Sequence, residues 1–416
     1  MAHFNFYFAR LLIHKGGAEK NETFQTQTPS RAPLQLCCVP RPRARQMPSR
    51  SRKPRVSDCT KRCRRQASAL LAANALGLAA AVEDAHSEMC GTEAAFGVMR
   101  RFPAPVRVGL CRTGGPWLER LFNSTTFMQN ADPFVYVNAG ANKGYNIAQV
   151  LQTLGGASFS NDDWMQQMIR HMKAGSAKSG KTTRYLCGVC RLCLLKRNDI
   201  QTLASLNVSV HAFEALPELH AWLKSAFAHF AVQGAVVHAA VGNESGTTHT
   251  LITPAAHADN FGWESSVIQE PRPGESRDPK GRPLTQITLK GLALDDYFRK
   301  HGLERVHYLS ADVERQEGNL LAGMRHALSR RAIDVLELEL GSAGWVGTTV
   351  KATLAWLNSL GYDCYWQAVS CLVPISGRCY NERYVDALLR MGGSNLVCAH
   401  GEARRGLRSQ VAHCHT

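Results

Sequence analysis

The stretch that decides the fold runs from Phe134-Val-Tyr-Val137 into Asn138-Ala-Gly-Ala-Asn-Lys-Gly144. The first four residues are β-branched or aromatic, which predicts a buried strand. The two glycines predict a tight turn, and the apolar residues over 147–151 predict a helix that begins near Tyr145. A strand, a glycine turn and a helix in this order are typical of the first unit of a parallel α/β sheet.

The pattern of strand followed by helix continues along the chain. We expect four further buried strands, at Val208–Phe213, Ala235–Val241, His307–Ala311 and Ile333–Leu340. We also expect a second helix that begins at Pro217, and a closing antiparallel pair of strands near residues 362–366 and 395–399. This alternation predicts a doubly wound, mostly parallel sheet with helices on both faces. Residues 156–206 look like a polar, cysteine-bearing insertion, and residues 269–283 look like an exposed loop.

The positive charge of the chain is concentrated at its beginning. The 416 residues carry a formal charge of +16, but residues 1–66 alone hold 15 Lys and Arg against three Asp and Glu. The rest is close to balanced, so we expect no specific nucleic-acid binding. No run of apolar residues is long enough to predict a transmembrane span. The sequence leaves the oligomeric state open.

The first 130 residues read as a lead-in to the main domain. Residues 1–66 are rich in Arg, Pro and Ser and poor in acids, which is typical of a disordered leader or a transit peptide. Residues 67–130 open with an Ala-rich stretch that resembles the apolar part of a secretory signal; an Ala-rich helix packed on the domain is the alternative. We therefore expect an organellar or secretory location, with a cytoplasmic one still possible, a main domain over 131–400 and a tail over 401–416.

Three candidate site elements follow the predicted strands. They are the glycine turn, the carboxylate of Glu214 after the second strand, and Asp312 after the fourth. In parallel sheets the ligand crevice lies beyond the carboxyl ends of the strands, so these elements are expected to meet. The turn lacks both a Walker A lysine and the spacing of an NAD fingerprint, which favours S-adenosylmethionine over ATP or NAD.

At this point the sequence resembles the FkbM-type methyltransferases. The resemblance is carried, over roughly residues 134–340, by Asn138-Ala-Gly-Ala-Asn-Lys-Gly144, Phe213-Glu-Ala-Leu-Pro217, Ala239-Ala-Val-Gly-Asn243, Leu294-Asp-Asp-Tyr-Phe298, Asp312-Val-Glu-Arg-Gln-Glu317 and Glu337-Leu-Glu-Leu340. It implies a Rossmann-like class I methyltransferase sheet and O-methylation of a hydroxyl on a small-molecule or carbohydrate acceptor. It also implies S-adenosylmethionine as cofactor, bound by Asn138, Gly140, Ala141, Asn142, Gly144, Glu214 and Ala240.

The acceptor hydroxyl benefits from a general base, and Asp312 is the candidate catalytic residue. A helix N-cap is the alternative role for Asp312. Glu317 is expected in the next helix, where a surface salt bridge is the alternative role. Glu339 is a candidate for the acceptor pocket, with burial beside an Arg partner as the alternative. Trp263 and Trp345 are candidates to stack on a sugar, with local packing as the alternative.

The chain departs from the family at several positions. Asn138 replaces an Asp, Ser310 stands where a Lys is common, and Arg315-Gln316 replaces Gly-Ala. A non-catalytic binding protein that keeps the fold is therefore a second hypothesis, and an NAD-type oxidoreductase is a third.

The chain has 14 cysteines, and the densest group is Cys187, Cys190 and Cys193. Two C-x-x-C steps supply three thiolates for a structural zinc, although no fourth ligand lies nearby. Disulfides or free thiols are the alternatives for this group. Four cysteines near the end, Cys364, Cys371, Cys379 and Cys398, are candidates for disulfides in an oxidising compartment.

Overall fold

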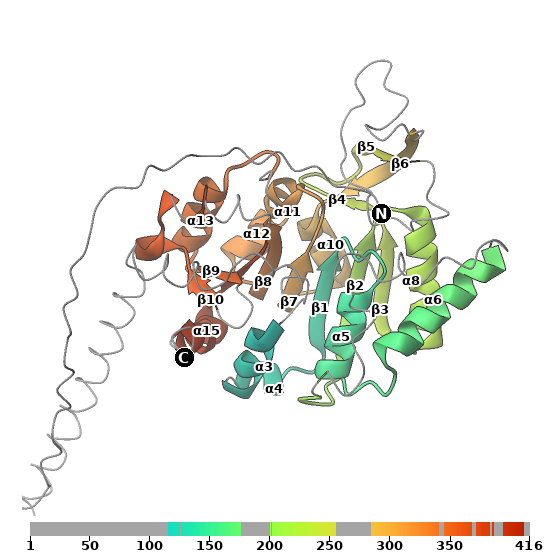
Figure 1. The fold of residues 1–416 in the computed structure, drawn as a ribbon. Helices are drawn as coiled ribbons and strands as arrows, with labels where there is room; N and C mark the ends of the chain where they lie inside the picture. Colours follow the sequence, from blue (N-terminus) through green and yellow to red (C-terminus); the bar gives the residue numbers. More distant parts are fainter. Residues whose placement is uncertain are drawn as a thin grey trace, which may run out of the picture. The chain divides into compact units, whose positions relative to one another are not determined.

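The computed structural model describes the main domain of the chain and part of its flanks (Figure 1). The described residues are 115–124, 126–175, 200, 202–254, 284–340, 345–367, 372–382, 385–386 and 394–411. All of them belong to one compact unit, Leu70–Thr416. The expected leader, the Ala-rich stretch, Trp263 and the cysteines at 187, 190 and 193 lie outside the described residues.

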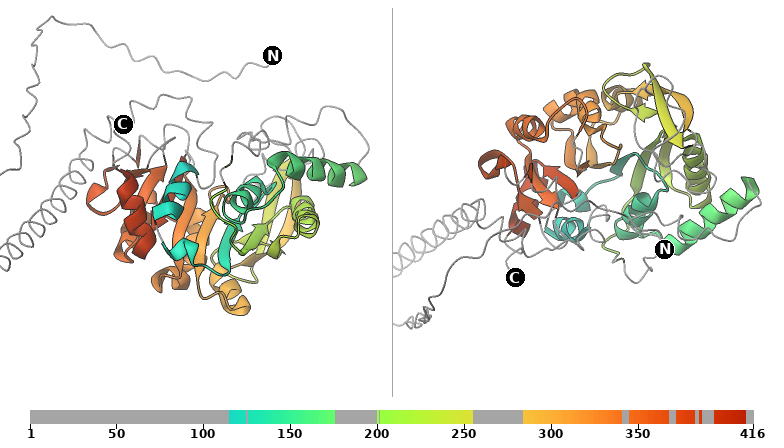
Figure 2. Two further views of the ribbon diagram at one scale, coloured as in Figure 1. Left: turned by 90° about the horizontal axis from the view of Figure 1, so that it is seen from below. Right: turned by 45° about the horizontal axis from the view of Figure 1, so that its top comes forward.

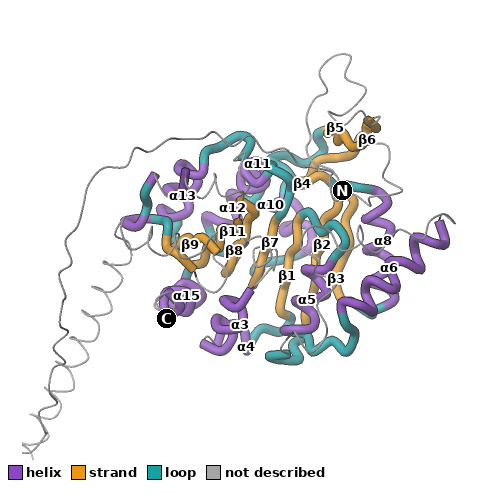
Figure 3. The backbone as a smooth tube through the Cα atoms, viewed as in Figure 1, coloured by secondary structure: helices purple, strands orange, loops and turns teal. Residues whose placement is uncertain are grey.

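An eight-stranded sheet forms the centre of this unit, in the order β10-β9-β11-β8-β7-β1-β2-β3 (Figure 3). Strands β3, β2, β1, β7 and β8 run parallel to one another, whereas β11 is antiparallel to both β8 and β9, and β10 is antiparallel to β9. The bounds are β1 Phe134–Ala139, β2 Val208–Glu214, β3 Gln233–His238, β7 Val306–Ala311, β8 Ile333–Leu340, β9 Asp363–Gln367, β10 Leu372–Pro374 and β11 Ser394–Ala399. The predicted α/β class with a mainly parallel sheet and closing antiparallel strands is confirmed.

The central strands are apolar on both faces because both faces are covered. Every residue of β1 and of β7 is buried. Alternate residues of β1 enter two different apolar clusters: Tyr136 packs into one of them, whereas Val135 and Val137 pack into the other. A side-chain period of two explains this division, and it accounts for the continuous apolar runs seen in the sequence.

Helices lie on both faces of the sheet (Figure 2) and contribute side chains to both clusters. The cluster around Tyr136 includes side chains from α3 Gly115–Ser124, α4 Thr126–Gln129, α5 Tyr145–Thr153, α6 Asn161–Gly175, α8 Pro217–His229 and α15 Gly401–Val411. The cluster around Val137 includes side chains from α10 Leu294–His301, α11 Glu317–Gly323, α12 Arg325–Ser329 and α13 Val350–Ser359. The sheet therefore lies between two layers of helices.

Helix α6 lies within the stretch that the sequence marked as an insertion. Its Trp164 and Met168 are fully buried, and the indole N–H of Trp164 donates to the carbonyl of Lys143 at 2.8 Å. The beginning of that stretch thus packs on the core, next to the glycine turn.

A small sheet adjoins the carboxyl ends of the parallel strands. It contains β4 Ala240–Val241, β6 Leu284–Leu292 and β5 Thr248–Pro254, in the order β4-β6-β5. The predicted strand over 235–241 is therefore two strands, because Glu214 pairs with His238 in the large sheet whereas Ala240 pairs with Gly291 in the small one. We did not predict β5 or β6 from the sequence, since they are partly exposed and lack a buried apolar run.

The closing strands carry a buried disulfide between Cys364 of β9 and Cys398 of β11, which are direct partners in the antiparallel register. Cys379, at the end of the 3-10 helix Gly377–Cys379, is also disulfide-bonded. The expectation that the cysteines near the end of the chain form bridges is confirmed for these three. Among the described helices, none has the length and apolar character needed to cross a membrane.

Candidate functional site

The glycine turn is fixed to the end of β2 by its backbone. The N–H groups of Gly140 and Ala141 both donate to the carbonyl of Phe213, at 3.0 and 2.9 Å. Gly140 has a φ of +76°, and a Cβ atom there would lie 1.8 Å from the carbonyl oxygen of Asp312. Only glycine fits this position, because the backbones of the turn and of the β7 end approach each other so closely.

Glu214 faces the glycine turn. One carboxylate oxygen accepts a hydrogen bond from the backbone N–H of Asn142 at 2.6 Å, and the other accepts from the N–H of Leu216 at 2.9 Å. The side chain is buried, and burial raises the pKa of its carboxyl to about 7, although the backbone hydrogen bonds counteract the rise. The carboxylate therefore ties the turn after β1 to the segment after β2.

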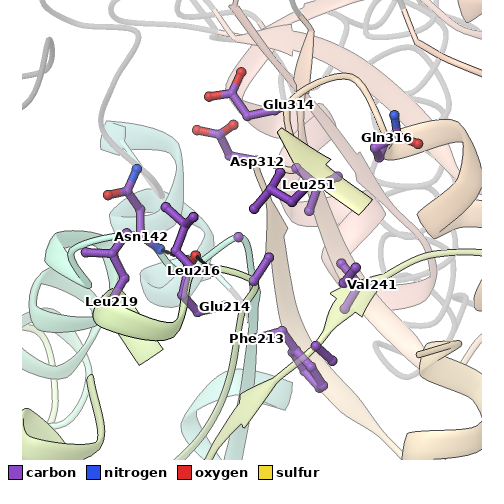
Figure 4. Close-up of a pocket in the computed structure, with 15 residues that line it drawn as sticks. Asn142, Phe213, Glu214, Leu216, Leu219, Val241, Leu251, Asp312, Glu314 and Gln316 are labelled. Atoms are coloured by element: carbon purple, nitrogen blue, oxygen red, sulfur yellow. Dashed lines mark hydrogen bonds between the residues drawn. The ribbon is translucent and has the colours of Figure 1, made fainter. Parts of the chain in front are cut away.

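A cavity that is partly open to solvent lies at these strand ends (Figure 4). Apolar side chains form much of its wall: Phe213, Leu216, Leu219, Val241 and Leu251. Its polar side chains come from Asn142, Glu214, Asp312, Glu314 and Gln316, and the backbones of Gly140 and Ala240 complete one side. A flat, mainly apolar group with a few polar atoms is the kind of ligand that such a wall accepts.

Four of the seven predicted cofactor residues line this cavity, namely Gly140, Asn142, Glu214 and Ala240. Ala141, Gly144 and Asn138 are not among its lining residues. Gly144 is instead the N-cap of α5, with a φ of +77°, and a Cβ atom there would clash with Leu223 and Trp164. The roles assigned to all seven residues stay predictions.

Asn138 belongs to a buried polar row across the sheet. Its side-chain amide donates to the hydroxyl of Ser310 at 2.7 Å, and the Tyr136 hydroxyl lies 2.7 Å from the same oxygen. Asn138 pairs in register with Ser310, which in turn pairs with Glu337. Two of the departures from the family pattern, at 138 and 310, therefore bond to each other.

Asp312 lies in the cavity, one residue after β7. The residue as a whole is exposed, and Figure 4 shows the carboxylates of Asp312 and Glu314 on the same side of the cavity. The surrounding protein raises the pKa of Asp312 by desolvation, and burial raises that of Glu314 to about 7. The N-cap alternative for Asp312 is wrong, because α11 begins at Glu317 and its N-cap is Gln316.

Glu317 and Glu339 lie beside Asp312. One oxygen of each of the three carboxyl groups lies within 4.8 Å of the others. Burial raises the pKa of Glu317 to about 8, and the charge of Asp312 is the main cause of a raised pKa at Glu339. A surface salt bridge at Glu317 is wrong, since this side chain is only 1% exposed.

Trp345 packs locally. Its indole N–H donates to the carbonyl of Glu339 at 2.8 Å, and the residue is buried. The next residue, Val346, donates its N–H to the carbonyl of Arg315 at 2.8 Å. Of the two roles considered for Trp345, the structure supports local packing, and this packing holds the segment after β8 against the segment after β7.

The sequence did not single out Leu251, Leu216 or Leu219 as part of the site. Leu251 comes from the small sheet, whose strands carry no site motif. Leu216 and Leu219 follow Glu214 closely, so their place after a site strand was a usable signal. Leu251 had no such signal, because only the pairing of β5 with β6 brings it to the cavity.

Comparison of the sequence with known protein families finds a match over part of the chain. Residues 202–364 match the methyltransferase FkbM domain. The resemblance found in the sequence is therefore confirmed. The FkbM domain match covers β2, the small sheet, β7, β8 and the start of β9, and thus Glu214 and all three clustered carboxylates. The glycine turn precedes it. Neither a curated protein nor a solved structure matches the chain.

Proposed function

We propose that this chain is an S-adenosylmethionine-dependent methyltransferase with a Rossmann-like class I sheet, which O-methylates a hydroxyl on a small-molecule or carbohydrate acceptor. The match to the FkbM domain supports the transferase class. The proposal rests on the position of Glu214. Its carboxylate accepts a hydrogen bond from the glycine turn, and the residue lines the cavity at the strand ends.

The residues around the cavity fit such a cofactor. The side-chain oxygen of Asn142 is buried and has no hydrogen-bond partner, although the residue lines the cavity. A ligand hydroxyl or amino group would satisfy it. Glu214 uses one lone pair on each oxygen for the backbone, which leaves acceptor capacity for ribose hydroxyls. Leu216, Leu219 and Leu251 offer apolar contact to an adenine ring.

S-adenosylmethionine, when bound, supplies a methyl carbon that its positive sulfur already activates. The protein then has to orient the acceptor hydroxyl, limit the access of water and receive a proton. Asp312 is suited to receive that proton because it lines the cavity and desolvation raises the pKa of its carboxyl. Val241 and Leu251 line the cavity and exclude water from part of it.

Isothermal titration of the full chain with S-adenosylmethionine and, separately, with NAD tests the proposal. Binding of the first and transfer of a labelled methyl group to a pool of extracted metabolites are the expected results. Binding without transfer to any acceptor would favour a non-catalytic protein that keeps the fold. Binding of NAD alone would contradict the proposal and favour an oxidoreductase.

An organellar or secretory location and a zinc site at Cys187, Cys190 and Cys193 stay proposals from the sequence. Sequencing of the mature N-terminus tests the first, because removal of a leader places the new terminus after residue 66 or the Ala-rich stretch. Metal analysis of the purified protein tests the second.

A further inference from the structure

Three carboxylates meet beside the proposed cofactor cavity, although they are far apart in the sequence. Asp312 follows β7, Glu317 is the first residue of α11, and Glu339 is the next-to-last residue of β8. Strands β7 and β8 are parallel neighbours, so their carboxyl ends lie at the same edge of the sheet. One oxygen from each side chain lies within 4.8 Å of the other two.

The buried member of this cluster has an unsatisfied oxygen. Glu317 is only 1% exposed; its Oε1 accepts the backbone N–H of Val313 at 3.1 Å, whereas its Oε2 has no hydrogen-bond partner. Within the described part of the chain, no ion pair joins Asp312, Glu317 or Glu339 to a Lys, Arg or His. A buried carboxylate oxygen without a hydrogen-bond partner is costly, and a cation is one of the groups that satisfy it.

We propose that Asp312, Glu317 and Glu339 bind a divalent cation of the Mg²⁺ type. Hard cations prefer oxygen ligands, and all the side-chain ligands offered here are carboxylate oxygens. In octahedral Mg²⁺ coordination, neighbouring oxygens lie about 3.0 Å apart and opposite oxygens about 4.2 Å apart, so the three side chains, whose oxygens lie within 4.8 Å of one another, have to move inward when the cation binds. The cation can enter from the cavity, because Asp312 is exposed there and lines it.

The cation would lie beside the proposed cofactor cavity, where it could take part in catalysis. This catalytic role rests on the proposed function. Three protein ligands leave coordination positions free for water or for an oxygen of the acceptor. With the cation bound, Asp312 would serve as its ligand and no longer as the proton acceptor; a hydroxyl bound to the cation would lose its proton more easily, and water in the open cavity would take that proton. The cation would thus hold the acceptor at the cavity and favour its ionised form.

Electron paramagnetic resonance of Mn²⁺ with the metal-stripped full chain tests the site without any assay of activity. We expect one Mn²⁺ ion to bind per chain, and we expect Mg²⁺ to displace it in a competition titration. Glu317→Gln and Glu339→Gln should each weaken Mn²⁺ binding at least tenfold. Glu337→Gln is the matched control, because Glu337 is a buried carboxylate on the same strand that bonds to Tyr308 and Asn395 instead. It should bind Mn²⁺ as the wild type does.

Thermal melting adds a second measurement that also checks the fold of each variant. Without metal, Glu317→Gln should melt at or above the wild-type temperature, because the uncharged amide keeps an oxygen that can accept the N–H of Val313. Added Mn²⁺ should raise the melting temperature of the wild type and of Glu337→Gln but not that of Glu317→Gln. If either glutamine variant of the cluster failed to fold, Asp312→Asn would take its place in the same comparison.

The proposal is overturned if the wild type binds no Mn²⁺ at millimolar concentration, or if the cluster variants bind it as tightly as the wild type does. Its failure is distinct from failure of the proposed function. Titration with S-adenosylmethionine in the absence of metal reports on the cofactor alone. If the chain binds the cofactor but not Mn²⁺, only the proposed cation site is rejected. If it binds Mn²⁺ but not the cofactor, only the proposed methyltransferase function is rejected.

Discussion

The carboxylate of Glu214 accepts a hydrogen bond from the backbone N–H of Asn142 at 2.6 Å, across 72 positions of sequence. This bond joins the turn after β1 to the end of β2, at the mouth of the proposed cofactor cavity. The carboxylate therefore has two roles: it holds the turn in shape through this hydrogen bond, and it faces the cavity. Substitution of Glu214 is therefore expected to affect ligand binding.

Replacement of Glu214 by Ala should weaken S-adenosylmethionine binding by about 1–3 kcal/mol, because hydrogen bonds to a charged group are lost together with the support of the turn. Titration calorimetry measures the change. Glu218→Ala is the matched control, because Glu218 is an exposed acid four residues further on. Equal affinities for the Glu214 variant and the wild type would remove the ribose-binding role.

Gly140→Ala should destabilise the protein by about 3 kcal/mol or more, since it adds a steric clash to the cost of a left-handed backbone. The new Cβ would lie 1.8 Å from the carbonyl oxygen of Asp312. Gly302→Ala is the control, because Gly302 also has a positive φ, of +64°, but has no atom within 4 Å of a Cβ. Urea denaturation should show a smaller loss of about 1 kcal/mol for the control.

Arg315 adopts a φ of +78° at the position where FkbM-type sequences have glycine. This left-handed conformation costs a non-glycine residue about 1–2 kcal/mol. Arg315→Gly should therefore be more stable than Arg315→Ala by about that amount, because both lack the Arg side chain and only Ala keeps the strain. Equal unfolding free energies for the two variants would show that the backbone there is not strained.

His307 should make the stability depend on pH below neutrality. Its Nδ1 accepts the backbone N–H of Val135 at 2.9 Å, and burial, with a further contribution from the charge of Arg305, lowers its pKa to about 4. The unfolded chain binds a proton near pH 6.5, so this contribution is complete above that pH and declines as the pH falls towards 4.

His307→Asn keeps an acceptor without the titration and serves as the reference. The unfolding free energy of the wild type relative to this variant should fall by about 1–3 kcal/mol between pH 7 and pH 4. This difference cancels the opposite trend of carboxyls with raised pKa, such as Glu214, which destabilise the fold as the pH rises. A constant difference between the two proteins would contradict the prediction.

The disulfide between Cys364 and Cys398 should stabilise the closing strands. It encloses a loop with a sequence separation of 34, for which loop entropy predicts about 3–4 kcal/mol. The double variant Cys364→Ala, Cys398→Ala should lose about that amount in urea denaturation. Adding a reductant to it should then cause no further loss from this bridge, whereas the oxidised wild type should lose stability on reduction.

Local pattern alone was enough for much of the scaffold. The buried run before Gly140, the carboxylate at the end of β2 and the antiparallel closing strands could all be read from the sequence. The reason is that strand burial on both faces and the conformational needs of a glycine turn leave a signature within a few consecutive residues. The order of motifs also led to the FkbM resemblance, although two of the positions that depart from it turn out to bond to each other.

The sequence by itself determined most strands of the large sheet and that polar groups follow the carboxyl ends of the parallel ones. Only the tertiary structure decided that Glu317 is buried against Asp312 and Glu339, that Asn138 lies in a row with Ser310 rather than along the cavity, and that Leu251 reaches the cavity from the small sheet. These relations depend on which strands are neighbours and in what register, and a contact between residues far apart in the chain leaves no local periodicity to read.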